Sequence, residues 1–198
     1  AGLGVGYPFT GSAPEMGAIE KFRTFYVSPE GNDYNDGLSP EHAWRSIGNG
    51  GPDLYPGDTV SVMSGVYADS VLILSSGMAD DMISYVGVRD SSFLDASGHY
   101  AAVRLDANHI RWSAISVANA SSSNMRCSGD SNLVEFCHFS NAGFYGAYMY
   151  GDDNRFFANV VRDNLYYGLL LGGGGEAINN TFYRNIQPSI LVSGGDPH

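Results

Sequence analysis

The chain has 198 residues, of which 43% are hydrophobic, and this is enough to bury a substantial core within one domain. Its formal net charge of −11 excludes nucleic acid as a partner, because a phosphate backbone is bound by a basic surface. No apolar run approaches the roughly 18 residues that a membrane-spanning helix needs. The 26 glycines, 13 tyrosines and 10 phenylalanines favour turns and strands, so we expect an all-β protein.

The first 22 residues predict an extended N-terminal arm, followed by a single domain at 23–198. Residues 1–22 mix glycine, proline and scattered apolar residues without a sustained period of 2 or 3.6. Small and apolar residues alternate there, with the larger ones at Leu3, Val5, Tyr7 and Phe9. This pattern fits a strand that adds to a sheet edge of a neighbouring copy, and it equally fits a cap over the protein's own first coil.

A repeat of 21 or 22 residues begins at residue 123. Four short segments end in glycine at this spacing: SNMRCSG, YGAYMYG, YGLLLGG and PSILVSG. A second family of strands opens three residues after the first three glycines, at Asn132, Asn154 and Glu176. A looser copy begins at Asn108, 24 residues before Asn132. The repeat therefore consists of strands joined by turns.

Apolar positions alternate within each copy and recur from one copy to the next. One predicted inward row comprises Met125, Cys127, Ala147, Met149, Leu169, Leu171, Ile190 and Val192. Two further rows are Val134, Phe156 and Ile178, and Phe139, Val161 and Phe182. A strand-only period this short predicts a single-stranded parallel β-helix of about seven coils, each with 21–24 residues. Right-handed coiling is the usual hand for parallel strand connections.

The region 25–74 carries several spaced motifs in order. These are YVSPEGNDYNDG from Tyr26, Trp44-x-x-Ile47, PGDTV from Pro56, and Gly65-Val66-Tyr67. They resemble the opening of secreted right-handed parallel β-helix proteins of the pectate-lyase-like superfamily, and the resemblance implies this fold and an extracellular location. The aspartates of this segment, Asp33 and Asp36, suit Asx turns, with calcium as the rival interpretation.

The resemblance also implies chemistry that this sequence matches poorly. Members of the lyase branch use a Lys or Arg base, generally with calcium, but the only lysine, Lys21, precedes the coils. Arginine would have to serve, and Arg126, Arg155, Arg162 and Arg184 are the ones in the repeat. The hydrolase branch uses aspartates with accompanying motifs that are missing around Asp152 and Asp153. We therefore assign no catalytic residue; an active protein would be a polysaccharide lyase or glycoside hydrolase.

Two structural ladders are expected from the 22-residue spacing. Asp130 and Asp152 stack one coil apart, which predicts either a ladder of Asx turns or a calcium site between the two carboxylates. We expect no cofactor other than this possible calcium ion. Asn159 and Asn180 align with Cys137 and predict an internal asparagine ladder at a bend of the β-helix. Cys127 is expected to face inward, and the two cysteines are either bridged or free.

Tyrosines crowd the last three coils, and the outward row of one strand family aligns Tyr148 with Leu170 and Leu191. Tyrosine can stack on sugar rings or form a protein interface, and the neighbouring leucines favour an interface. Two functions follow. One is an extracellular structural subunit that joins copies of itself head to tail into a filament, because the final coil has no polar cover. The alternative is a carbohydrate-active enzyme or polysaccharide-binding module, with polysaccharide as its partner.

Overall fold

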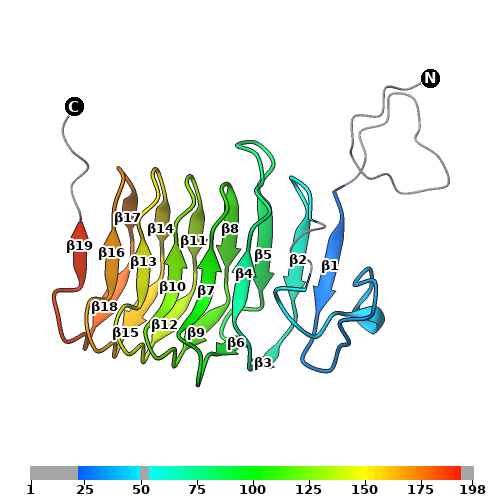
Figure 1. Ribbon diagram of the computed structural model, residues 1–198, viewed down its shortest axis with the longest axis horizontal. Coiled ribbons are helices and arrows are strands. Elements are labelled where there is room, and N and C mark those ends of the chain that lie inside the picture. The colour runs from blue at the N-terminus through cyan, green and yellow to red at the C-terminus, as the bar shows by residue number, and fades with distance from the viewer. Residues whose placement is uncertain (1–21, 50–53, 193–198) are drawn as a thin grey trace.

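The computed structural model describes residues 22–49 and 54–192, and it is a parallel β-solenoid of about six turns built from three parallel sheets. The coils lie side by side along one axis from β1 to β19 (Figure 1). Within the described residues there is no α-helix, and one short 3-10 turn, η1 at Pro40–His42, lies beside the first coil. The predicted arm residues Leu3, Val5, Tyr7 and Phe9 lie outside the described residues.

From β2 onward each coil contributes one strand to each sheet, and β1 adds a further strand to sheet A. Sheet A has seven strands: β1 Thr24–Val27, β2 Thr59–Val62, β5 Ile83–Gly87, β8 Ile110–Ser113, β11 Leu133–Glu135, β14 Arg155–Phe157 and β17 Glu176–Ile178. Sheet B has six: β3 Gly65–Tyr67, β6 Ser92–Asp95, β9 Ser116–Ala118, β12 His138–Ser140, β15 Val160–Arg162 and β18 Thr181–Tyr183. Sheet C also has six: β4 Val71–Ile73, β7 Ala101–Leu105, β10 Ser123–Cys127, β13 Ala147–Met149, β16 Leu169–Leu171 and β19 Ile190–Val192.

The predicted inward rows form the core. Met125 pairs with Ala147, which pairs with Leu169, and all three side chains are fully buried. The row of Phe139, Val161 and Phe182 is confirmed by the pairing of β12, β15 and β18. Ile190 and Val192 were expected in the core but are 39% and 67% exposed, because their strand β19 has a described neighbour on one side only.

Two register predictions are wrong by one or two residues. Phe156 pairs with Ala177 and not with Ile178, so Arg155, not Asn154, is the partner of Glu176. The turn before β17 is one residue shorter than its predecessor, and Gly173 and Gly174 close it with φ of +55° and +72°. In the earlier copy, Trp112 pairs with Val134, which makes the step 22 residues and not 24.

The motifs around Asp33 build the first coil. The Asp33 carboxylate accepts hydrogen bonds from the backbone N–H groups of Arg45 and Ser46, both at 2.8 Å, and from the Ser46 hydroxyl at 2.7 Å. Asp36 accepts from the Leu38 N–H at 3.0 Å, which is an Asx turn. The predicted Asx turn is therefore present at Asp36, whereas Asp33 instead joins its loop to Arg45 and Ser46, 12 and 13 residues further along the chain. The ring of Trp44, which this loop surrounds, stacks on Phe25 at 4.6 Å between centroids.

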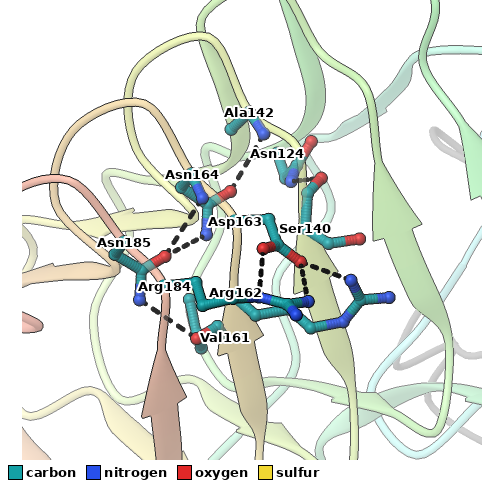
Figure 2. Close-up of polar contacts among 9 residues, drawn as sticks. All are labelled: Asn124, Ser140, Ala142, Val161, Arg162, Asp163, Asn164, Arg184 and Asn185. Atoms are coloured by element: carbon teal, nitrogen blue, oxygen red, sulfur yellow. Dashed lines mark hydrogen bonds and ion pairs between the residues drawn. The ribbon is translucent and has the colours of Figure 1, made fainter.

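Asparagine ladders satisfy the backbone at all three corners of the coils. At the corner between sheets A and B, the predicted ladder is confirmed: Cys137 N–H donates to Asn159 Oδ1 at 2.9 Å, and Asn159 N–H donates to Asn180 Oδ1 at 2.8 Å. A second ladder of Asn132 and Asn154 lies between sheets C and A. A third, of Asn164 and Asn185, lies between sheets B and C (Figure 2). Buried turns are thereby supplied with the hydrogen bonds that the strands cannot give them.

Candidate functional site: an aromatic face on sheet C

The outer side of sheet C carries a cluster of six aromatic rings, which we call the tyrosine face. They come from the turns and outward positions around β13 and β16: Phe144, Tyr145, Tyr148, Tyr150, Tyr166 and Tyr167. Phe144 and Tyr150 are 40% and 43% exposed, and the other rings are half-buried. An exposed aromatic surface of this kind is characteristic of a binding site.

The 22-residue step stacks the rings of one coil on those of the next. Phe144 lies on Tyr166 with 4.3 Å between centroids and an interplanar angle of 11°, and Tyr145 lies parallel to Tyr167 at 6.1 Å. Within one coil, the centroid of the Tyr148 ring lies 5.1 Å from that of Tyr145 and 4.9 Å from that of Tyr150. Phe144 was not singled out from the sequence, although its spacing of 22 residues from Tyr166 was the signal that could have found it.

Glycine makes this arrangement possible at the start of each strand. A Cβ atom on Gly146 would lie 2.6 Å from the carbonyl oxygen of Gly168 and 2.6 Å from a methyl group of Val161. The residue that follows Tyr145 must therefore be glycine for the coils to keep their spacing. The Tyr-Gly pair recurs at Tyr167 and Gly168 for the same reason, and the two tyrosines are held in parallel.

One arginine of the face, Arg126, has no carboxylate partner among residues 22–49 and 54–192. The Arg126 guanidinium lies 5.7 Å from the centroid of the Tyr148 ring, its neighbour in register. Arg104, the other neighbour of Arg126, is paired with Asp106. Among the described residues, the remaining arginines of the predicted set are paired with carboxylates: Arg155 with Glu176, and Arg162 and Arg184 with Asp163. Arg126 is thus available to a ligand.

Acidic side chains line the turn beside the tyrosine face. Asp130 and Asp152 stack as predicted, since the Asp152 N–H donates to Asp130 Oδ1 at 2.8 Å, and the Asp130 N–H donates to Asn108 Oδ1 at 2.8 Å. Asp106 accepts a hydrogen bond from the Ser128 hydroxyl at 2.7 Å. The predicted turn ladder is therefore present, and calcium binding at Asp130 and Asp152 stays a prediction. No cluster of three or more metal-ligating side chains occurs in 22–49 or 54–192.

The predicted interface residues are neighbours in register. Tyr148 pairs with Leu170 and Leu170 with Leu191, on β13, β16 and β19. Sequence reasoning placed them correctly in one outward row, but it did not place carboxylates beside the tyrosines, because those come from the following turn rather than from the strand. This combination of rings, an arginine and carboxylates is chemically suited to a sugar ligand.

Burial raises the pKa of Tyr145, and the neighbouring hydroxyls of Tyr148, Tyr166 and Tyr167 raise it further. The phenol is therefore neutral at physiological pH and can donate a hydrogen bond. Tyr145 and Arg126 both adjoin the Tyr148 ring, so the face offers a neutral donor and a cation, which suits a ligand that carries both hydroxyl and carboxylate groups.

No family model matches the sequence, and no curated protein matches it. Solved structures do match its fold. A pectate lyase, Pel9A, superposes with a TM-score of 0.70 at 18% identity over 83% of this chain and 47% of its own length. A rhamnogalacturonan lyase gives 0.61 at 14% identity over 87% of this chain and 66% of its own. A pectin methylesterase in complex with a hexasaccharide gives a TM-score of 0.51 at 10% identity, over 90% of this chain and 68% of its own length.

These likenesses show that the chain has the parallel β-helix fold of these carbohydrate-active enzymes. The resemblance read from the motifs at Tyr26, Trp44 and Pro56 is thereby confirmed at the level of fold. The chain spans about half the length of the pectate lyase that it matches. Within the described residues, no helix is long and apolar enough to cross a bilayer.

Proposed function

We propose that the protein is an extracellular carbohydrate-active protein that binds an acidic polysaccharide along the tyrosine face. The fold neighbours are two polysaccharide lyases and an esterase, which favours this hypothesis over self-assembly into a filament. The filament hypothesis stays a prediction.

The observation that carries the proposal is the position of Arg126 over Tyr148, without an acidic partner among the described residues. An aromatic ring supports the apolar face of a sugar, and an adjacent guanidinium binds a carboxylate in a bidentate manner. The protein carries a net charge of −11, so an acidic polymer would be repelled from most of its surface. Binding therefore depends on a local cation, and Arg126 supplies it.

The rest of the face supplies complementary groups. Tyr145 and Tyr150 flank Tyr148 within one coil and extend the stacking surface beyond a single ring. The Asp106 carboxylate and the Ser128 hydroxyl lie in the adjoining turn, where they can exchange hydrogen bonds with sugar hydroxyls.

The test is a calorimetric titration of the protein with polygalacturonate and with an uncharged galactan. We expect saturable binding of polygalacturonate, weaker binding of the galactan, and a loss of affinity of about tenfold or more for Arg126→Gln, since a hydrogen bond to a charged group contributes about 1.5–3 kcal/mol. Tyr148→Ala should weaken binding of both polymers, because it removes the stacking surface.

Arg155→Gln is the matched control, because Arg155 is an exposed arginine on the outer side of sheet A and is paired with Glu176. It removes the same charge from a different sheet, and its affinity should equal that of the wild type. Equal losses for Arg126→Gln and Arg155→Gln, or no binding of polygalacturonate, would contradict the proposal. The same samples, assayed for unsaturated or reducing products, show whether binding leads to cleavage.

A further inference from the structure

The outer side of sheet B carries a groove that the tyrosine face does not include. Its volume is about 250 Å³, and it is lined by Asp90, Phe93, Ser116, His138, Ser140 and Arg162. These residues come from strands β6, β9, β12 and β15 and from the loop before β6. The groove thus spans four neighbouring coils.

The register explains why the surface is hollow there. In one outward row of sheet B, Phe93 pairs with Ser116. In the adjacent outward row, Ala118 pairs with Ser140, and Ser140 pairs with Arg162. Small side chains in the middle coils are thus bounded by a phenylalanine on one side and an arginine on the other. The floor consists of serine hydroxyls, which exchange hydrogen bonds in either direction.

The Arg162 wall carries a net positive charge. Asp163 accepts hydrogen bonds from Arg162 Nη1 and from Arg184, whose Nε and Nη2 lie at 2.6 and 2.8 Å from its two oxygens (Figure 2). The hydrogen bonds from Arg184 and then Arg162 lower the pKa of Asp163. Two guanidinium groups therefore share one ionised carboxylate, which leaves one excess positive charge beside the groove.

The opposite wall of the groove carries a carboxylate, that of Asp90, beside the imidazole of His138. His138 Nε2 lies 3.7 Å from Asp90 Oδ1, and both side chains are well exposed. A phosphate or sulfate, which is charged on all sides, would be repelled by Asp90. A ligand with one carboxylate and several hydroxyls matches both walls, because Arg162 binds the carboxylate while Asp90 and His138 bind hydroxyl groups.

We infer that this groove is a second binding site, and that it binds a single sugar residue bearing a carboxylate. Arg162 pairs with the carboxylate, the hydroxyls of Ser116 and Ser140 bond the ring hydroxyls, and Phe93 contacts the apolar side of the ring. The site lies on sheet B, whereas the tyrosine face lies on sheet C. The inference therefore stands independently of polymer binding by the tyrosine face.

The test is an NMR titration of the wild-type protein with monomeric galacturonic acid, read at the imidazole resonances of His138, which are assigned by their absence from His138→Gln. We expect saturable shifts with a dissociation constant that is about millimolar, given the small size of the ligand. Galactose and acetate should each bind at least about tenfold more weakly, because each lacks one half of the recognised chemistry.

Arg162→Gln should weaken galacturonic acid binding about tenfold or more, and Asp163 keeps its bonds to Arg184 in this variant, so the fold is retained. Arg155→Gln, which removes an equal charge from sheet A, should bind as the wild type does. The inference is overturned by an absence of shifts at His138, by equal binding of acetate or galactose, or by equal losses in the two arginine variants.

Discussion

The side-chain oxygen of Asn180 accepts a hydrogen bond from the backbone N–H of Asn159 at 2.8 Å, one coil away. The side-chain amide of Asn159 in turn bonds two residues of the preceding coil: Oδ1 accepts from the Cys137 N–H, and Nδ2 donates to the Val134 carbonyl, both at 2.9 Å. Each ladder asparagine therefore joins two coils through a buried turn.

Replacement of Asn159 by leucine should lower the free energy of unfolding by about 2–5 kcal/mol, because it leaves the Cys137 N–H and the Val134 carbonyl unpaired in the interior. Urea denaturation measures the loss. Asn108→Ala is the control: Asn108 also accepts a bond from the next coil, at Asp130, but it is exposed and water can replace it. Equal losses in the two variants would show that the buried ladder has no special role.

The inward and outward rows predict opposite tolerance of charge. Leu171 is 2% exposed, so Leu171→Asp should destabilise the protein by several kcal/mol, on the order of the cost of burying an unpaired charge after relaxation. Arg126→Asp changes an outward residue and should shift the melting temperature little. Differential scanning calorimetry distinguishes them, and similar melting temperatures for both variants would refute the assignment of rows.

Both thiols should be unreactive in the folded protein. Cys127 and Cys137 are free and buried, and burial raises the pKa of each to about 12. We expect no alkylation by iodoacetamide at pH 8 under native conditions and two labels per chain after unfolding without reductant, detected by intact mass. An unfolded chain that takes up no label would instead indicate a disulfide.

The Asp163 cluster predicts a small dependence of stability on pH. Hydrogen bonds from Arg184 and Arg162 lower the folded-state pKa of Asp163 below its unfolded value. The contribution is therefore present above the unfolded pKa and is lost as the pH falls through the folded one. The stability difference between the wild type and Asp163→Asn should thus shrink on acidification below about pH 4. A difference that is constant from neutral to strongly acidic pH would contradict this.

The sequence predicts the fold well because the repeat is local and regular. Met125, Ala147 and Leu169 fall in one row at a constant step of 22 residues, and the parallel pairing follows from that step. The register predicted for Glu176 is wrong because Gly173 and Gly174 shorten the preceding turn by one residue. Both glycines adopt positive φ, and the alignment of side chains between copies does not show this conformation.

The candidate sites are less predictable than the fold. The repeat places Tyr148 and Arg126 side by side. It does not show which arginines pair with a carboxylate, because ion pairs depend on the positions of side chains in neighbouring turns. The groove at Arg162 depends on residues from four coils, including Asp90 of an irregular loop. Composition and spacing do not specify such contacts.

The corners of the coils differ in how they could accept added residues. Between sheets A and B, one residue with positive φ is followed by a ladder position, as at Ala158 and Asn159, and an insertion there would break the ladder. Between sheets C and A, the chain already varies, from residues 74–82 in one coil to 172–175 in another. Loop grafts that reshape specificity therefore belong in the C–A turns ahead of Asn132 or Asn154, where the buried bonds of these two asparagines are kept and the turn adjoins the tyrosine face.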